Sequence, residues 1–379
     1  MYNHFMANAN TSDFEKVQFE KMINTPVSKL IISLAIPTII SMLVTAIYNM
    51  ADTFFVGKIS TSATAAVGVV FSLMAIIQAI GFFFGHGSGN YIARKLGEED
   101  FESAKDMVAT GFFLCLIVCT ILGLTGLIFI KPLAYFLGST DTIYPHAKAY
   151  MTYILIGFPI TASTFVLNNQ LRFQGNAFYG MIGIVAGGFL NIALDPLFIF
   201  VFDMGVAGAA LATVIARFTE LAFIAYVTHK NVDKYKFING AYRSLKIPRK
   251  LAFEITKKCI PLMLNETLWS GGMAVLVQCY SVRGYYVVSA LNINSTVSNV
   301  FNVSFIAMGS AIAIIIGQLL GRGDTEEAVS SVRKLTVFSV LLCSAVGVVM
   351  ALFSPLFPLI YKTGDDVRTL AAQFIMCSA

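Results

Sequence analysis

The sequence predicts an all-α integral membrane protein. Of its 379 residues 57% are hydrophobic and only 12% are charged, with a mean hydropathy of +0.75. A soluble domain carries about 25% charged residues. The chain also shows repeated apolar runs with short polar breaks, and about 20 apolar residues are enough to span a bilayer as a helix. These observations together exclude an ordinary soluble domain.

The apolar runs give the elements in order along the chain. We expect nine spanning helices near 29–55, 62–92, 106–130, 146–167, 177–201, 206–228, 252–281, 286–318 and 330–353, and the start of a tenth near 367. Residues 1–28 contain Asp13, Glu15 and Glu20 and lack the apolar core of a signal peptide. They are expected to form a cytoplasmic N-terminal tail.

The loop charges predict the orientation. If the N-terminus is cytoplasmic, Arg217 lies within a helix and only six of the 26 Lys and Arg residues fall in outer segments: Lys58, Lys131, Lys148, Arg283, Lys362 and Arg368. Inner loops are enriched in such residues. The pattern predicts a multi-pass protein of the plasma (inner) membrane with a cytoplasmic N-terminus. It also explains the net charge of +5 without a nucleic-acid partner.

The two halves of the chain repeat. A shift of 224 residues places Ile36-Pro37 on Ile260-Pro261 and Leu96-Gly97 on Leu320-Gly321. The same shift also matches Asp100 with Asp324, Cys119 with Cys343, Gly123 with Gly347 and Asp141 with Asp365. With an even number of helices per repeat, the halves are expected to be related by an axis along the membrane normal.

This repeat predicts the domain organisation. An N-lobe of helices 1–6 is expected over 29–229, a cytoplasmic inter-lobe linker over 230–251, and an incomplete C-lobe of helices 7–10 over 252–379. The period of the repeat implies a design of twelve helices, of which this chain is expected to hold nine and the start of a tenth.

Acids inside the apolar runs are the candidate functional residues, because a charge at the bilayer centre costs about 2.5–3.5 kcal/mol. At 1.5 Å per residue, Asp195 lies about 27 Å along its helix and Thr213 about 10 Å below the outer face. Asp52 falls in the same slab, and Asn191 precedes Asp195 by one turn. Their oxygens suit a hard cation or a proton. For Asp52 an ordinary interfacial position is an equal alternative.

Pro196 directly follows Asp195 and is the candidate hinge. A proline inside a helix removes one backbone donor and frees the carbonyl one turn earlier, here that of Ile192. Irregular backbone of this kind commonly lines transporter sites. The alternative is that Asp195 caps a new helix with Pro196 at its first position, which would leave LFIFVF as a loop.

Two further features have less specific readings. Glu266 is either a second protonatable group or a polar group that faces water in a cavity. Arg217 and Glu220 are three residues apart on one helix and are expected to pair with each other.

The glycines of GFFFGHGSGN carry a prediction of their own. Gly81, Gly85 and Gly89 stand four residues apart, as in close helix packing. Packing or a gating bend is favoured over a ligand role for His86.

Several function classes find no support in the sequence. No phosphate-binding loop and no metal-protease motif occur, so ATP hydrolysis and zinc chemistry are not indicated. A membrane-embedded enzyme would need a constellation such as paired His and Glu or a Ser-Lys dyad, and none stands at a plausible depth. We therefore expect no enzymatic activity and no cofactor.

The motifs resemble those of the multidrug and toxic compound extrusion (MATE) family. LNIALDPLFIF followed by GVAGAALATVIA resembles a family signature, as do LAIPTIISMLVTAIYNMADTFFVGKI and GNYIARKLGEED. The GFFFGHGSGN stretch is similar to the MepA-like branch. The resemblance covers the chain from about residue 22 onward.

This resemblance implies a MATE-type bundle of two six-helix lobes around a central cavity. It implies a Na⁺ or H⁺ site at Asp52, Asn191, Asp195 and Thr213, and a helix-seven acid at Glu266. The expected activity is export of organic, often cationic, drugs or dyes in exchange for Na⁺ or H⁺ as coupling ion. The transporter is expected to be a monomer in the lipid bilayer.

A flippase of lipid-linked oligosaccharides, from the same wider superfamily, is the alternative. Such a protein would be expected to carry more basic residues in the helices that line its cavity. Only Arg217 clearly lies inside such a helix here, which argues against this alternative.

Overall fold

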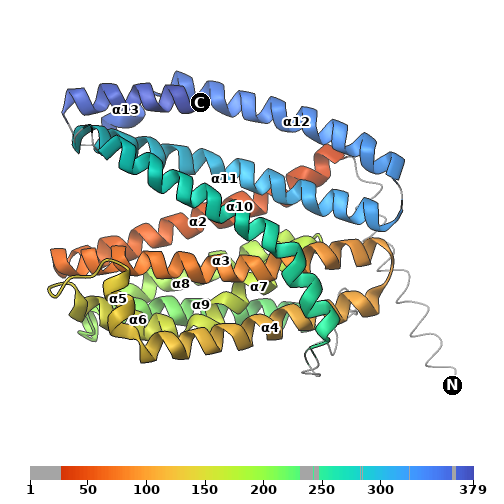
Figure 1. Cartoon of the computed structure of the whole chain (residues 1–379), viewed down its shortest axis with the longest axis horizontal. Helices are drawn as coiled ribbons and strands as arrows, with labels where there is room; N and C mark the ends of the chain where they lie inside the picture. The colour runs from red at the N-terminus through yellow and green to blue at the C-terminus, as the bar shows by residue number, and fades with distance from the viewer. Residues whose placement is uncertain are drawn as a thin grey trace.

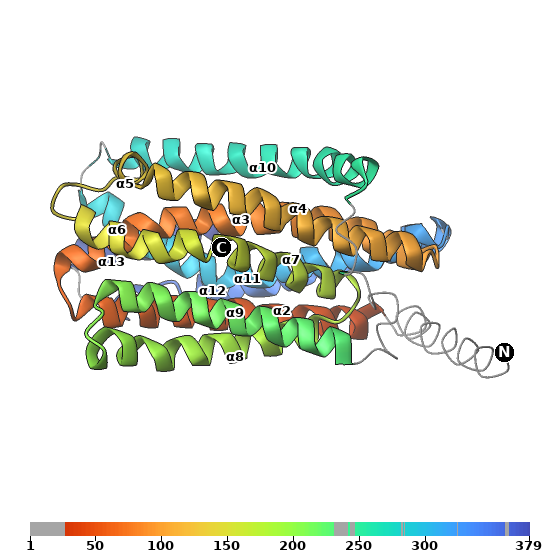
Figure 2. The same cartoon turned by 90° about the horizontal axis from the view of Figure 1, so that it is seen from below.

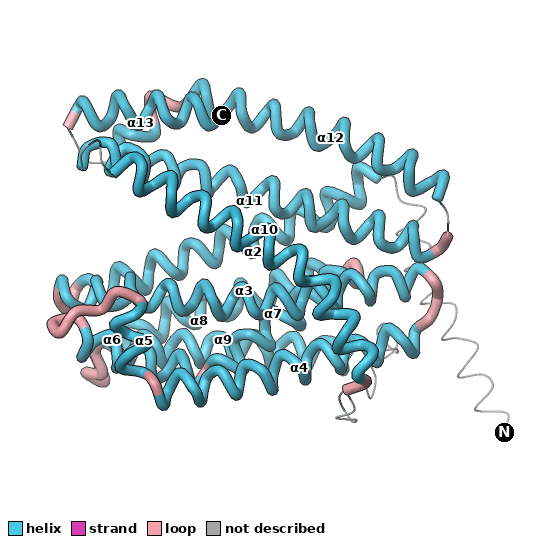
Figure 3. The backbone as a smooth tube through the Cα atoms, viewed as in Figure 1, coloured by secondary structure: helices cyan, strands magenta, loops and turns pink. Residues whose placement is uncertain are grey.

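The protein is all-helical in the computed structural model, which describes residues 27–230, 242, 247–281, 283, 285–323, 325–360 and 364–379. Figure 3 shows helices joined by loops and turns, with no strand in these ranges. The expected N-terminal tail and most of the expected inter-lobe linker, including 231–241, lie outside the described residues. The proposed domain boundaries therefore stay a prediction.

The helices form two groups, shown in Figure 1. The first helix group consists of α2 (Val27–Gly57), α3 (Thr61–Gly97), α4 (Phe101–Ile128), α5 (Ile130–Phe136), α6 (Tyr144–Ile156), α7 (Phe158–Phe173), α8 (Ala177–Pro196), the π-helix η1 (Leu197–Val201) and α9 (Val206–Lys230). The second helix group consists of α10 (Arg249–Ser281), α11 (Tyr285–Gly321), α12 (Thr325–Leu352), the short η4 (Phe357–Ile360) and α13 (Asp365–Ser378).

The helices match the ten expected segments, with two differences. Among the described residues, seven helices are long and apolar enough to cross a membrane, or eight if the pair α6 and α7 counts as one span. That pair is bent by 54°, because Gly157 ends α6 and Pro159 occupies the first turn of α7. The helix α10 is not among the apolar spans; its sequence carries Asn265 and Glu266 in mid-helix.

The glycines of α3 allow α7 to approach closely, as predicted. A Cβ added at Gly81 would lie 2.7 Å from Phe165 Cβ, and one at Gly89 would lie 2.2 Å from the Phe173 ring. His86 lies between them, with its ring edge-on to those of Phe82 and Phe173. The packing role is therefore confirmed.

The first group is a compact bundle around α3. Figure 2 shows α2, α8 and α9 along one side of this bundle, and these three helices contact one another. This arrangement brings the predicted site residues of α2, α8 and α9 within reach of each other.

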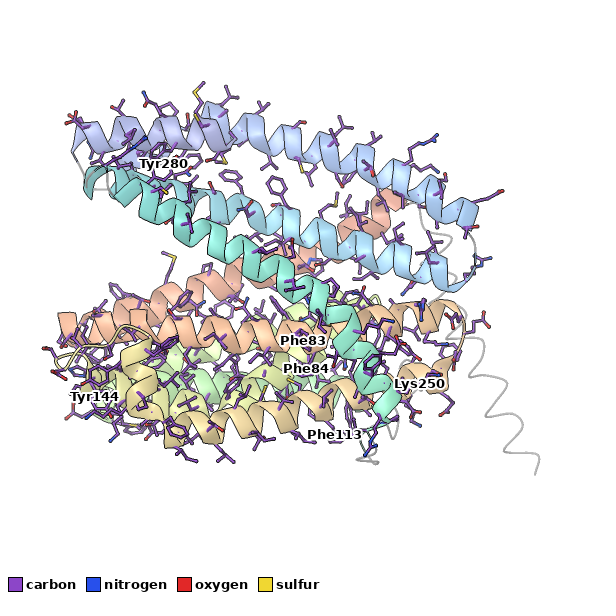
Figure 4. All side chains as sticks on the ribbon, in the orientation of Figure 1. Phe83, Phe84, Phe113, Tyr144, Lys250 and Tyr280 are labelled. Carbon is purple, nitrogen blue, oxygen red and sulfur yellow. The ribbon has the colours of Figure 1, made fainter. Side chains whose placement is uncertain are left out.

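The two groups meet chiefly at the end that holds the α3–α4 and α11–α12 turns. Figure 1 shows α2 and α10 crossing between the groups there, while α3 and α11 diverge toward the other end. The Cys259 thiol of α10 donates to the Phe83 carbonyl of α3 at 2.9 Å, and Figure 4 labels Phe83 at this crossing. At the opposite end, Tyr280 packs edge-on against Phe374 within the second group.

Candidate functional site

Asp52 lies on α2 and is held by a tyrosine from α6. The Tyr150 hydroxyl donates to Asp52 Oδ2 at 2.8 Å. Both side chains are buried, Tyr150 completely. Asp52 is therefore enclosed by protein. Its depth in the membrane, and with it the interfacial alternative, stays a prediction.

Asp195 and Asn191 lie one turn apart on α8 and face Thr213 on α9. Asn191 Nδ2 donates to Asp195 Oδ1 at 3.3 Å and to Thr213 Oγ1 at 3.4 Å. The Thr213 hydroxyl in turn donates to the carbonyl of Ala209. The face-sharing that a four-residue spacing predicts is thus present in the structure.

The two halves of this cluster adjoin each other. Asp52 and Asp195 are close enough to interact electrostatically, and Tyr150 is within reach of both Thr213 and Asp195. The structure therefore brings together all four residues that the sequence singled out, Asp52, Asn191, Asp195 and Thr213, and adds Tyr150.

Three oxygens of this cluster lack a hydrogen bond. Within the described part of the chain, Asp52 Oδ1, Asn191 Oδ1 and Asp195 Oδ2 are buried and have no donor. A buried acceptor without a partner costs roughly 1–3 kcal/mol, and more when it is charged. Carboxylate and amide oxygens of this kind are suited to a bound cation, or to protons on the carboxylates.

Pro196 stands where α8 changes its helical form. The α-helix continues through Asp195 and Pro196, and the chain then winds as a π-helix over Leu197–Val201. The alternative in which Asp195 caps a new helix and LFIFVF is a loop is therefore wrong. Single π-helical turns occur often at functional sites. The hinge role of Pro196 stays a prediction.

The predicted pairing of Arg217 with Glu220 is confirmed. Arg217 donates to Glu220 Oε2 at 2.8 Å and to the Tyr48 hydroxyl. Its guanidinium also lies 4.9 Å from the centre of the Phe165 ring. Asn168 of α7 donates to the other carboxylate oxygen of Glu220. The network joins α2, α7 and α9, and Arg217 lies one turn beyond Thr213 along α9.

Two cavities adjoin the acid cluster. The larger lies between α2, α3, α6, α7 and α9, and its wall includes Phe71 and Phe165. Its volume of about 550 Å³ includes space that is open to the surroundings. The smaller, of about 220 Å³ by the same measure, is lined in part by Asn191 and Glu220. Tyr48, Thr213 and Arg217 line both cavities. The larger cavity therefore lies directly beside the acid cluster, with Thr213 in common.

The predicted residue Glu266 cannot be compared with the structure. Its side chain lies outside the described residues, and only its place within α10 is known.

Tyr150 was not predicted. The depth argument finds it when applied to polar aromatic residues as well as acids, because its helix begins at the same end of the bundle as α9 and Tyr150 lies in the first two turns.

The comparisons with known proteins identify the family. The MatE family model matches residues 37–197 and 261–379. The chain therefore belongs to the MatE family, the multidrug and toxic compound extrusion family of membrane transporters. The matched segments contain α2 from Pro37 onward and all of α8, including Asp52 and Asp195.

Curated relatives have two kinds of name. One is "FAD transporter" of Shewanella oneidensis, 23% identical over 94% of this chain and 79% of its own length. Another is "Multidrug export protein MepA" of Staphylococcus aureus, 30% identical over 68% of this chain. The match to MepA spans only 56% of that protein's length.

Solved structures share the fold. A crystal structure of MATE in the bent conformation has a TM-score of 0.84 at 26% identity, and covers 94% of this chain and 81% of its own. A MOP superfamily transporter from Pyrococcus furiosus, described by a reverse polarity of its binding pocket, has a TM-score of 0.83 at 27% identity and covers 94% and 78%. The predicted MATE-type fold is confirmed.

Proposed function

We propose that this protein is a secondary active transporter that exports organic compounds across the plasma membrane in exchange for Na⁺ or H⁺. In this proposal the coupling ion binds among Asp52, Asn191, Asp195 and Thr213, and the compound occupies the larger cavity of the first helix group. The N-terminus is cytoplasmic, and the transporter works as a monomer in the lipid bilayer.

The observation that carries the proposal is the set of three unbonded oxygens in the acid cluster. Two carboxylates held close together in an apolar bundle repel each other when both are ionised. A cation or protons at the cluster remove that repulsion and occupy the free acceptors. The cluster is thus more stable when loaded, as a coupling site must be.

The shared wall of the two cavities suggests how ion and compound are coupled. Thr213 contacts Asn191 and also faces the larger cavity. An ion at Asp195 and a compound in the cavity therefore act on the same hydroxyl. If ion binding weakens compound binding through this contact, the compound must weaken ion binding by the same factor. That reciprocity is the thermodynamic requirement for exchange.

The relatives support export of small molecules but differ in the compound they name. One is named for multidrug export and another for FAD. The larger cavity has aromatic walls from Tyr48, Phe71 and Phe165, which suit any flat aromatic compound. A cationic dye and FAD are therefore both necessary test compounds.

The proposal is tested in proteoliposomes under separately imposed Na⁺ and pH gradients. We expect one of the two gradients to drive accumulation of a cationic dye or of FAD against its own gradient. Accumulation that is the same with and without either gradient contradicts ion coupling. Transport of neither compound under either gradient contradicts the export of such aromatic compounds.

The flippase alternative is distinguished in the same preparation. Scrambling of a labelled oligosaccharide lipid, without movement of dye or FAD, would favour the flippase. Arg217 is the one basic residue in the wall of either cavity as the structure describes them, and Glu220 already neutralises it. The walls thus offer little to the phosphates of a lipid-linked sugar.

A further inference from the structure

At one end of the molecule the two helix groups approach each other backbone to backbone. A Cβ added at Gly97, the last residue of α3, would lie 2.2 Å from the carbonyl oxygen of Gln318 on α11. A Cβ added at Gly321, the last residue of α11, would lie 2.1 Å from the carbonyl oxygen of Arg94 on α3. Each helix end therefore touches the backbone of the other.

The two contacts are counterparts in the internal repeat. The shift of 224 residues carries Arg94 onto Gln318 and Gly97 onto Gly321. Gly97 of the first half therefore contacts Gln318, the counterpart of Arg94. Gly321 of the second half contacts Arg94, the counterpart of Gln318. A local two-fold axis passes between the helices here, in the same way that it does in a symmetric dimer interface.

Neighbouring features obey the same symmetry. Ala93 and Gly317 are also counterparts, and the Cβ position of Gly317 lies 3.5 Å from Ala93 Cβ. The turns that follow each carry a residue with positive φ at equivalent places, Glu99 at 58° and Gly323 at 80°. The reciprocal contact is therefore part of a repeated helix-and-turn geometry and is not an isolated approach.

Buried apolar side chains extend this contact along the helices. One hydrophobic cluster joins Ala93 of α3 to Ile314, Ile315 and Leu319 of α11, and includes Leu34 of α2. Toward the other end of α11, Ile293 and Val297 belong to a cluster made only from the second group. The groups are thus sealed at the end where the glycines meet.

We propose that the reciprocal contact of Gly97 and Gly321 is a gate between the two helix groups, which forms only because neither position carries a Cβ. The proposal rests on the transport function proposed above, since a transporter must open each end in turn. The sealed end is the cytoplasmic one in the orientation that the loop charges predict. A side chain at either glycine prevents its closure.

The size of the obstruction supports this. Carbon and oxygen atoms in such contacts stay about 3.3–3.6 Å apart. A methyl group at either position must therefore move the helices by roughly 1 Å. The obstructing atoms are backbone carbonyls, so no change of rotamer can make room.

The test measures the distance between spin labels across the gate. Glu102 and Glu326 are exposed counterparts at the starts of α4 and α12, and labelled cysteines there, in the full chain with its native cysteines replaced, report the separation of the groups. We expect Gly97→Ala with Gly321→Ala to shift the distance distribution toward longer distances. A distribution equal to that of the parent overturns the proposal.

The matched controls are Gly68→Ala on α3 and Gly309→Ala on α11. Both glycines have open space at the Cβ position, so they add the same methyl group to the same helices without obstruction. If the double variant does not insert, the two single gate variants replace it. Reciprocity then predicts similar shifts in both, and a shift in neither, or in one only, contradicts the proposal.

The measurement needs no transported compound. A failed transport assay therefore leaves the gate test unaffected, and an unchanged distance distribution leaves the transport assay unaffected.

Discussion

Asp195 is the residue whose chemistry the surroundings define most clearly. It is completely buried, its one hydrogen-bond donor among the described residues is Asn191, and its second oxygen has none. In the proposed function Asp195 acts as an ion ligand through its charge, because asparagine keeps the shape and one acceptor oxygen but cannot hold a proton or a negative charge.

We therefore expect Asp195→Asn to abolish ion-driven export while the protein still inserts in the membrane. The physical reason is the loss of one of the two carboxylates that give the cluster its affinity for a cation or proton. The measurement is dye or FAD transport in proteoliposomes, with Asp106→Asn, an exposed acid on α4, as matched control. Undiminished transport in Asp195→Asn refutes the site.

Tyr150 carries a second prediction. Its hydroxyl is the donor to Asp52 Oδ2, and phenylalanine would leave that buried oxygen without a partner. We expect Tyr150→Phe to lower the free energy of unfolding by about 1.5–3 kcal/mol, as for a hydrogen bond to a charged group. Thermal unfolding in detergent measures this.

The control for Tyr150→Phe is Tyr153→Phe. Tyr153 lies one turn along the same helix and is only half-buried, so its loss of a hydroxyl should change the unfolding temperature little. Equal effects of the two substitutions would mean that the bond to Asp52 contributes nothing of its own.

At the scale of elements, the α3–α7 contact shows what glycine spacing does in this bundle. Gly85 lies against Asn169 and Gly89 against Phe173, so glycines four residues apart on α3 contact residues four residues apart on α7. This interface was predictable because spacing alone determines which residues share a helix face.

We expect Gly89→Ala to destabilise the protein by about 1–3 kcal/mol, the usual result of overpacking a well-filled interior. The added methyl group would overlap the buried Phe173 ring. Gly68→Ala on the same helix meets open space and should instead be neutral or stabilising by about 0.5–1 kcal/mol, since alanine favours the helix. Chemical unfolding compares the two; a Gly89 variant as stable as the Gly68 variant would rule out this packing.

Two local features of the helices could not be predicted from the sequence. The bend between α6 and α7 at Gly157 was not predicted, because a glycine or proline in a long apolar run signals a possible break but not its angle. The π-helix after Pro196 was not predicted either, since proline determines which hydrogen bond is lost but not which pattern replaces it.

At the scale of the whole molecule, composition and the internal repeat were enough to predict the helical membrane fold, whereas the family was predicted from the resemblance of its motifs. The residues of the candidate cluster were found from depth. Depth along a helix is a simple function of residue number, so residues from α2, α8 and α9 could be placed in one slab. Tyr150 on α6 was missed because this argument was applied to acids and their neighbours and not to polar aromatic residues.

The predicted orientation is open to a direct measurement. Glu99 and Thr140 are exposed. Glu99 lies in the α3–α4 connection and Thr140 in the α5–α6 connection, and these connections are at opposite ends of the bundle in Figure 1. We expect a cysteine at Thr140 to react with a membrane-impermeant thiol reagent in intact cells, and one at Glu99 to react only after permeabilisation, in a background without native cysteines. The physical reason is the excess of basic residues in the inner loops. The reverse labelling pattern would invert the topology.

The reciprocal glycine contact has a consequence for how the two halves can diverge. They already differ in chemistry, since Asp52 in the first half corresponds to Leu276 in the second. At the contact between the halves such a difference is not possible, because each glycine packs against main-chain atoms, which every residue has. A substitution in one copy cannot be compensated by a substitution facing it in the other. The two halves of such a duplicated sequence can differ in their acidic residues, but both must keep glycine, the residue without a Cβ, at this one position.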